Sequence, residues 1–146
     1  MKTPFARPFR KRDAEPLLSD YKGRSQIFAA FFGVKEAGLM QVELQEWNNS
    51  LRVWDFAVWP KFQRKGVGAA LMDKCKELAM GKGARRIVLE TQTSNAGAIA
   101  FYLSQGFELA GMDATNYRND DVGRCEVRLE LAYHLKARGK KNERAL

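Results

Sequence analysis

Apolar and polar positions in the first half of the chain follow a pattern that predicts an antiparallel sheet. Residues 26–32, 39–47 and 51–58 are apolar or aromatic runs of strand length, separated by turn-forming residues at 33–38 and 48–50. Asn and Gly tolerate the backbone angles of tight turns. Because the connections are short, we expect three strands in an antiparallel meander.

The spacing of apolar residues changes after residue 66. Val67, Leu71, Cys75 and Leu78 recur three and four residues apart, as on one face of a helix. The glycine-rich segment 81–83 is a suitable helix end. The pattern therefore predicts a helix over residues 67–80.

The remaining apolar segments predict one more helix and three more strands. Residues 87–89 form a short unbroken apolar run, typical of a strand covered on both faces. Asn95 is a suitable cap for a helix that stops at Gly106, and a strand starts over 107–110. In the last strand, apolar residues of 127–135 alternate with mostly polar ones, which predicts one core face and one largely solvated face. The order β-β-β-α-β-α-β-β predicts an α/β (α+β) fold, a mixed and mainly antiparallel sheet with packed helices.

The charge of the chain is concentrated at its two ends. Residues 1–24 hold seven Lys/Arg against three Asp/Glu, and residues 136–146 hold five against one. The body between them is balanced, whereas a nucleic-acid-binding domain carries its excess on the folded surface. We expect a basic N-terminal segment at 1–24, a folded domain at 25–135, a basic tail at 136–146, and no nucleic-acid partner.

Cysteine usage and hydropathy bear on location. Cys75 and Cys125 form neither a disulfide framework nor a metal-spaced pair, so we expect reduced thiols in a cytoplasmic protein. No apolar run approaches the roughly 18 residues of a membrane span, which argues against a membrane partner. The chemistry below needs no metal. The sequence leaves the oligomeric state open, a homodimer included.

The segment between the third strand and the first helix has the composition of a phosphate-binding loop. A helix start leaves amide N–H groups without partners and is electropositive. Glycines at 66 and 68 remove side chains that would hold a phosphate away, and Arg64 and Lys65 add positive charge. The Walker and dinucleotide-binding patterns do not fit this segment. A pyrophosphate cradle is predicted, with a glycine-rich turn beside a solvated basic pair as the alternative.

A second group of residues shares one side of the second predicted helix. Asn95, Ala98 and Tyr102 are spaced three and four apart, whereas Phe101 falls on another face. Together they offer an amide, room for a thin ligand and a titratable hydroxyl. The alternative for Tyr102 is a core aromatic residue with a satisfied hydroxyl.

These two segments resemble the donor-binding motifs of the GNAT superfamily of N-acetyltransferases. Gln63-x-x-Gly66-x-Gly68 is similar to its pyrophosphate motif, and 95–107 is similar to its following motif, Asn-x-x-Ala-x-x-Phe-Tyr-x-x-x-Gly-Phe. The resemblance covers about residues 26–135, so the 25–135 domain is expected to be a GNAT domain. It implies acetyl-CoA as co-substrate and direct transfer of acetyl to a primary amine in a ternary complex.

The resemblance also implies roles for individual residues. Asn95, Ala98 and Tyr102 would contact the donor, with Tyr102 facing the thioester sulfur as general acid. The strand backbone would pair with the pantetheine arm, and the loop would hold the pyrophosphate. These donor-binding positions are Phe56, Ala57 and Val58 on the strand, and Gln63, Arg64, Lys65, Gly66, Val67, Gly68 and Ala69 on the loop.

Shorter matches resemble the streptothricin acetyltransferases, which modify an antibiotic amine and confer resistance. They are Trp54-Asp55, the segment 89–92, and 106–117 with Asp113 and Tyr117. The expected acceptor is a small-molecule amine, such as a streptothricin-type or other cationic antibiotic. The residues expected to bind it are Trp54, Asp55, Glu90, Asp113 and Tyr117. Glu90 is the expected base and Asp55 the holder of the substrate's charge, with the reverse assignment left open.

One departure from the family pattern concerns the start of the chain. Members normally place a strand and two helices before the position of Gln26, and here about 25 residues precede it. We therefore expect a shortened N-terminal region and an acceptor site that is open, completed by a partner subunit or altered. The alternatives are an acetyltransferase for a protein N-terminus, lysine or polyamine, and a non-catalytic acyl-CoA sensor.

Overall fold

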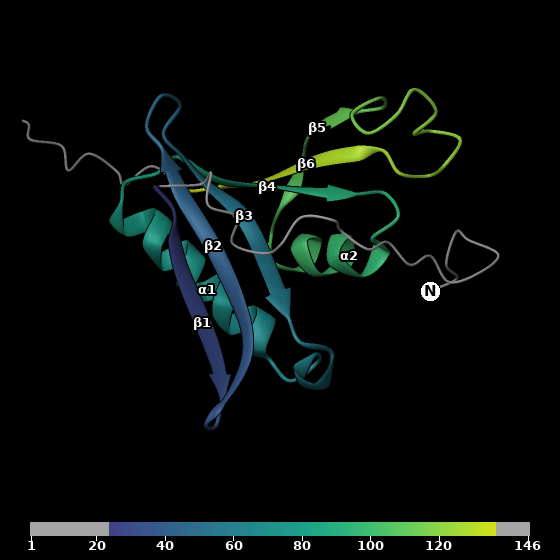
Figure 1. Ribbon diagram of the computed structural model, residues 1–146. Helices are drawn as coiled ribbons and strands as arrows, with labels where there is room; N and C mark the ends of the chain where they lie inside the picture. Colours follow the sequence, from purple (N-terminus) through teal and green to yellow (C-terminus); the bar gives the residue numbers. More distant parts are fainter. Residues whose placement is uncertain (1–23, 137–146) are drawn as a thin grey trace, which may run out of the picture.

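A twisted six-stranded sheet is the framework of the part of the chain that the computed structural model describes, residues 24–136 (Figure 1). The predicted basic segments 1–24 and 136–146 lie almost wholly outside the described residues. The strands are β1 (Gln26–Phe32), β2 (Lys35–Gln45), β3 (Ser50–Val58), β4 (Arg86–Gln92), β5 (Glu108–Asp113) and β6 (Arg128–His134).

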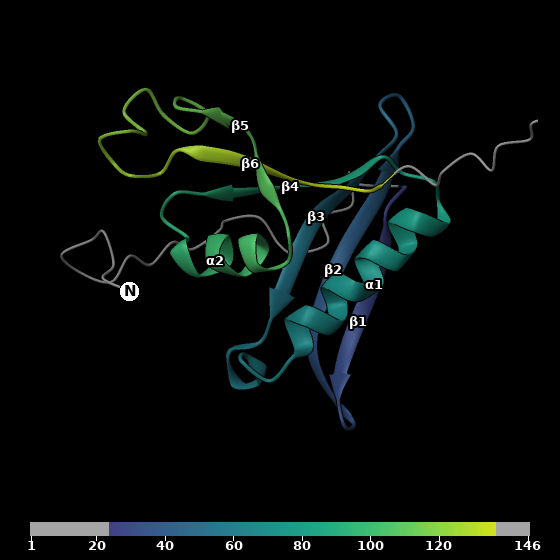
Figure 2. The same ribbon diagram turned by 180° about the vertical axis from the view of Figure 1, so that it is seen from behind.

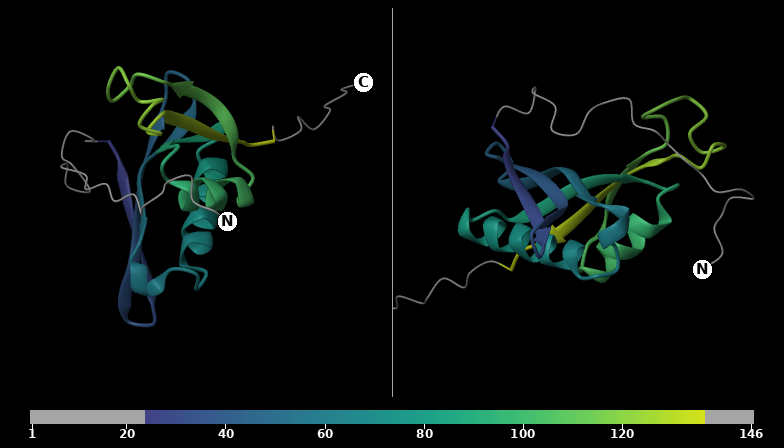
Figure 3. Two further views of the ribbon diagram at one scale, coloured as in Figure 1. Left: turned by 90° about the vertical axis from the view of Figure 1, so that its right-hand side faces the viewer. Right: turned by 60° about the horizontal axis from the view of Figure 1, so that its bottom comes forward.

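Two helices cover one face of this sheet. They are α1 (Val67–Gly81) and α2 (Ala96–Ser104), and both lie on the same side of the strands (Figures 2 and 3). The core fills the space between them and the sheet, with Met40, Leu51, Met72, Cys75 and Ile87 fully buried. None of the described helices is long and apolar enough to cross a membrane.

The strand order is β1-β2-β3-β4-β6-β5, and every neighbouring pair is antiparallel except β3 and β4. This arrangement confirms the predicted element order and the mixed, mainly antiparallel sheet. Residues 87–89 are also buried as expected for a strand covered on both faces.

One predicted turn is shorter than expected. The prediction covers residues 33–38, but β2 begins at Lys35 and includes Gly38. Gly33, with φ of 63°, makes the turn. At Gly38 a Cβ atom would lie 2.4 Å from the carbonyl oxygen of Ala57, so this glycine permits close approach of β2 and β3.

The predicted solvated face of the last strand is only partly solvated. Ala132 is fully buried, and Arg128 and Glu130 are half-buried. Both charged side chains take part in ion pairs across the sheet, Arg128 with Glu90 on β4 and Glu130 with Arg52 on β3. Period-two alternation identifies the two faces of a strand, but it does not show whether polar side chains on one face cover each other.

Candidate active site

The parallel strands β3 and β4 separate partway along their length. They are paired from Ser50 with Arg86 to Val53 with Leu89. Beyond that point β3 stays paired with β2, whereas β4 continues beside β6 (Figure 1). Over its second half, β3 is therefore not paired with β4. This half includes the predicted positions Phe56, Ala57 and Val58.

A β-bulge marks the point of separation. Val42 and Gln41 are neighbours on β2, but their partners on β3 are Val53 and Asp55, so Trp54 is the extra residue. A bulge bends its strand and increases local twist. It accounts for the divergence of β3 from β4 next to the predicted donor-binding backbone.

The predicted phosphate loop follows β3 and delivers the chain to the start of α1. A short 3-10 helix, η1 (Pro60–Phe62), leads into it, and the Gln63 side-chain amide donates to the Val58 carbonyl at 3.1 Å. Gly66 is the helix N-cap, with a left-handed φ of 82° that suits glycine. The first turn has no acidic residue and no side-chain cap from the described residues.

The start of α1 has N–H donors that come before its regular hydrogen-bond pattern. The amide of Ala70 donates to the Gly66 carbonyl, so the amides of Val67, Gly68 and Ala69 precede the first helical hydrogen bond. Arg64, Lys65 and Gly66 are exposed beside them. Donors and helix dipole together suit a phosphate oxyanion.

Gly68 has a different structural role from the one expected. A Cβ atom there would lie 3.3 Å from the Phe101 ring and 3.6 Å from a methyl group of Val58. The missing side chain therefore lets α1 approach α2 and β3 closely. This Cβ would point into the protein, so its absence makes room for packing and not for a phosphate.

Helix α2 brings the second predicted group next to this loop. Asn95 is its N-cap, and the side-chain oxygen of Asn95 accepts from the amide of Ala98 at 3.2 Å. Phe56 contacts both aromatic residues of α2, with ring centroids 5.7 Å from Phe101 and 6.0 Å from Tyr102. The end of β3, the start of α1 and the middle of α2 thus meet at one place.

Tyr102 is enclosed by aromatic side chains. Its side chain is 7% exposed, and the rings of Phe56, Phe101 and Phe107 lie around it. Burial raises the pKa of its hydroxyl to about 12, with a smaller contribution from nearby Cys75. The phenol is therefore protonated throughout the neutral range.

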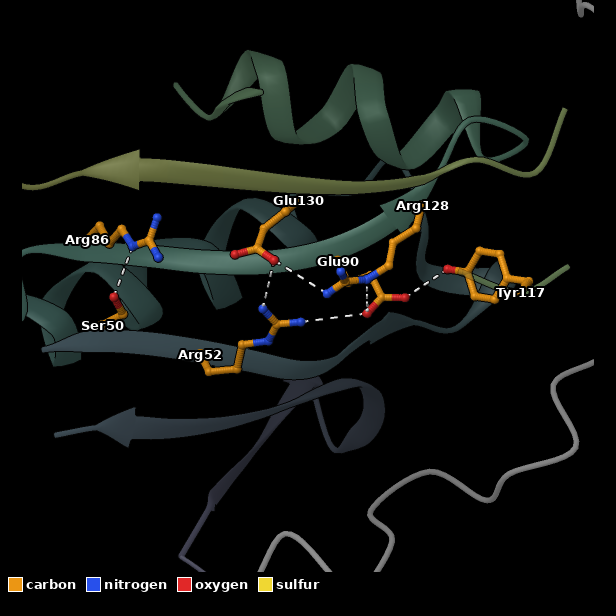
Figure 4. Close-up of polar contacts among 7 residues, drawn as sticks. All are labelled: Ser50, Arg52, Arg86, Glu90, Tyr117, Arg128 and Glu130. Atoms are coloured by element: carbon orange, nitrogen blue, oxygen red, sulfur yellow. Dashed lines mark hydrogen bonds and ion pairs between the residues drawn. The ribbon is translucent and has the colours of Figure 1, made fainter. Parts of the chain in front are cut away.

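The opposite face of the sheet carries a network of charges around Glu90 (Figure 4). Its Oε2 atom lies 2.9 Å from Arg128 Nε and 3.6 Å from Arg52 Nη2. The Tyr117 hydroxyl donates to Oε1 at 2.8 Å. Glu130 completes the network at 3.6 Å from Arg52 and 3.4 Å from Arg128.

Proton affinities in this network follow from its contacts. Burial, followed by the hydrogen bond to Glu90, raises the pKa of Tyr117 well above its ordinary value. The hydrogen bond with Glu90 likewise raises the pKa of Arg128. At neutral pH the phenol is thus a neutral donor and the guanidinium is charged.

The predicted acceptor residues fall on this face in two places. Trp54 donates through Nε1 to Glu43 at 2.8 Å, and the Arg52 guanidinium lies 5.1 Å from its ring centroid. Asp113 ends β5 and accepts hydrogen bonds from Thr115. Sequence reasoning missed Arg52, Arg128 and Glu130, although the alternation of charge at 128 and 130 was visible.

Comparison with known proteins identifies the family. The model described as the acetyltransferase (GNAT) family matches residues 2–107, and the chain belongs to this family. The chain is 36% identical over 73 residues to streptothricin acetyltransferase A of Bacillus subtilis (strain 168), covering 50% of this chain and 42% of that protein. It is 36% identical over 69 residues to the [ribosomal protein bS18]-alanine N-acetyltransferase of Escherichia coli (strain K12), covering 47% of each.

A solved structure agrees with these relatives. The crystal structure of a putative streptothricin acetyltransferase from Bacillus anthracis, in complex with acetyl coenzyme A, matches with a TM-score of 0.70 and 28% identity. The match covers 77% of this chain and 63% of that one. The aligned regions span somewhat less than half of the two curated relatives.

Proposed function

We propose that the protein is an acetyl-CoA-dependent N-acetyltransferase that acts on a primary amine. The observation that carries this proposal is the convergence of three elements: the uncapped start of α1, the separated half of β3, and Tyr102 on α2. The bound donor would supply an activated acetyl thioester. The GNAT relatives, one solved with acetyl coenzyme A, support the same donor.

The residues present fit this donor in type and position. The amides from Arg64 to Ala69 would hold the pyrophosphate, and the backbone of 56–58 would hydrogen-bond the pantetheine amides. The Asn95 side-chain oxygen is used as a helix cap, so its NH₂ group would make the contact with the donor. Ala98 and Tyr102 would line the path of the thioester, and Gln63 would brace the loop through Val58.

Tyr102 is proposed to return a proton to the leaving sulfur. Its raised pKa keeps the hydroxyl protonated, which a general acid requires. Packing by three aromatic rings fixes the direction of the phenol. Dry surroundings also strengthen its electrostatic contact with a developing thiolate.

The contacts of Glu90 favour other roles for Glu90 and Asp55 than those expected from the sequence. Both carboxylate oxygens of Glu90 already have partners, with Oε1 accepting from Tyr117 and Oε2 paired with Arg52 and Arg128. We assign Glu90 to orienting the acceptor and Asp55 to taking its proton. Asp55 shares a sheet face with Gln41, its partner on β2, and this is the face that carries Glu90.

This division is tested with matched variants that remove one charge each. Asp55→Asn should lower kcat by about 100-fold and leave the KM of the acceptor nearly unchanged, because a general base contributes about 10² or more. Glu90→Gln should mainly raise the KM of the acceptor. A large loss of kcat in Glu90→Gln but not in Asp55→Asn would restore Glu90 as the base.

The acceptor is proposed to be a polar, cationic small molecule of the streptothricin type. Similarity to streptothricin acetyltransferases and the acidic residues Glu90 and Asp113 support this choice. Similarity to the bS18-alanine enzyme favours a protein N-terminus as the second candidate, and lysine or polyamine acceptors share that donor site. The free cysteines Cys75 and Cys125 agree with a cytoplasmic site of action.

The experiment that tests the function combines donor binding with an acceptor panel. Acetyl-CoA binding is measured by calorimetry, and release of free thiol is followed with streptothricin, polyamines, lysine and N-terminal peptides. We expect micromolar donor binding and turnover with a cationic acceptor. Donor binding without thiol release from any amine would favour the acyl-CoA sensor, and absence of donor binding would refute the proposal.

A further inference from the structure

Arg86 differs from the other two arginines on the face opposite the helices. Its Nε donates to the hydroxyl of Ser50 at 2.9 Å, and Ser50 is fully buried (Figure 4). This contact fixes the guanidinium from one side. Arg52 and Arg128 each contact two carboxylates, whereas among residues 24–136 no carboxylate lies within ion-pair distance of Arg86.

The group drawn in Figure 4 therefore carries more positive than negative charge. Arg52 and Arg128 share the two carboxylates of Glu90 and Glu130, whereas Arg86 pairs with neither, which leaves one positive charge uncompensated within the group. The Arg86 guanidinium carries five N–H donors, and only the one on Nε is used in a hydrogen bond with the described residues. The remaining donors suit a ligand that accepts hydrogen bonds.

Arg86 lines a pocket that extends across β4, β6 and β5. The pocket has a volume of about 590 Å³, and it is also lined by Arg128, Glu130 and residues 110–114 at the end of β5. Asp113 lies at its other end, opposite Arg128 on β6, while Arg86 is opposite His134. Six residues of β6 separate these positions, or about 20 Å of strand. Asp113 is thus too far along the strands to neutralise Arg86.

We propose that this pocket is a binding site for an anionic group, a carboxylate or a phosphate, held by Arg86. It lies on the face opposite the proposed donor site and shares Arg128 and Glu130 with the network around Glu90. The anion is either part of a carboxylate-bearing acceptor or a separate ligand. Only the first of these sources rests on the proposed function.

The site itself is tested by anion binding, without any turnover. Glutarate and inorganic phosphate are titrated into the labelled protein and followed by NMR. Arg86→Gln should weaken binding at least tenfold, and Arg86→Lys should weaken it less. Arg85→Gln is the matched control, because the Arg85 side chain also makes a single hydrogen bond, to the Asn48 carbonyl, but is exposed and outside the pocket.

The source of the anion is tested with two acceptors, ε-aminocaproate and hexylamine, which have the same chain length and differ only in the terminal carboxylate. Their kcat/KM values are compared in the wild type, Arg86→Gln and Arg85→Gln. A preference for the acid that only Arg86→Gln removes assigns the site to the acceptor. Arg86-dependent anion binding without such a preference assigns it to a separate ligand.

The failure of the site and the failure of the proposed function give different results. If no amine is acetylated, the proposed function fails while the binding titration still decides the site. Anion binding that is undetectable, or equal in Arg86→Gln and the wild type, overturns the site.

Discussion

On the helix-covered face of the sheet, Tyr102 and Cys75 are buried among apolar side chains, whereas on the opposite face Glu90 lies among partly exposed ion pairs. Burial raises the pKa of both the Tyr102 hydroxyl and the Cys75 thiol to about 12, so neither is ionised near neutrality. The first face is held by packing. The second is held by electrostatic contacts that salt weakens.

In the proposed function, this difference would separate the two substrates physically. A thioester benefits from a dry site, because water there would hydrolyse it and weaken the contacts that favour transfer. A polar amine needs a face with charged partners. The point where β3 separates from β4 lies beside both Phe56 and Glu90, so it is where the two substrates would meet.

The largest expected effect comes from removing the Tyr102 hydroxyl on the helix-covered face. Tyr102→Phe keeps the ring and its three aromatic neighbours, so stability and donor affinity should change little. The turnover number should fall at least about 100-fold, or about 3 kcal/mol of barrier. Wild-type activity that depends on this acid should persist to about pH 11, since the raised pKa delays loss of the proton.

Pre-steady-state kinetics distinguish chemistry from product release in this test. If the chemical step limits the rate and Tyr102→Phe keeps more than a third of wild-type turnover, another group reprotonates the sulfur. Phe107→Leu is a control for disturbed packing. It alters an aromatic neighbour of Tyr102 but leaves the hydroxyl in place.

The next effect is on stability at alkaline pH. Cys75 ionises near 9 in the unfolded chain but near 12 when folded, mainly because burial penalises the thiolate. The folded state thus binds this proton more tightly, and stability is lost as pH rises from 9 towards 12. At about 1.4 kcal/mol per pH unit, the thiol accounts for roughly 2–3 kcal/mol lost at pH 11.

Urea unfolding at pH 8 and pH 11 measures this loss. Cys75→Ala creates a cavity and is less stable at both values, but its stability should fall less between them. Cys125→Ala is the matched control, because Cys125 is exposed. If Cys75→Ala and the wild type lose the same free energy, the thiol is not the group responsible.

The strands and helices of this chain were predictable because each depends on residues close together in sequence. Both donor motifs are also contiguous segments, so their type and order were visible before any fold was known. The partners of Glu90 were not. Arg52 reaches it through the parallel pairing of β3 with β4, and Arg128 through insertion of β6 between β4 and β5.

Glycines show the same limit at the scale of single atoms. The sequence marks Gly38 and Gly68 as special, but the reason lies in the segments that approach them. Gly38 makes room for the Ala57 carbonyl and Gly68 for the Phe101 ring. No local pattern distinguishes these roles from a turn or a phosphate contact.

A substitution at Gly68 tests how packing on the helix-covered face supports the predicted phosphate loop. Gly68→Val adds atoms beyond a Cβ that already lies 3.3 Å from Phe101, so overpacking should cost about 1–3 kcal/mol of stability. The start of α1 should shift, and acetyl-CoA affinity should fall about tenfold or more, or about 1.4 kcal/mol. Both are measured by calorimetry.

Two further variants make this result interpretable. Gly97→Ala places a methyl group in open space on α2 and should leave affinity unchanged while raising stability slightly. Gly68→Val with Phe101→Leu should recover part of the stability, since the ring is the obstacle. Unchanged affinity in Gly68→Val would show that the donor does not use the start of α1.

The smallest expected effect concerns Lys65, a positively charged residue of the predicted phosphate loop. Its ammonium lies 5.5 Å from the Phe32 ring centroid and 5.8 Å from that of Phe62. Such contacts contribute about 0.5–1 kcal/mol at exposed sites. Lys65→Gln and Phe32→Leu should each weaken acetyl-CoA binding by a factor of about two to five.

If the ring acts by holding Lys65 near the phosphates, the two changes are not additive. The double variant should then bind acetyl-CoA no more weakly than Lys65→Gln alone. Acetyl-pantetheine, which lacks the pyrophosphate, should bind all four proteins equally. Equal weakening of both ligands by Phe32→Leu would mean that the ring supports the fold of the loop, and that the charge of Lys65 contributes nothing specific to the phosphates.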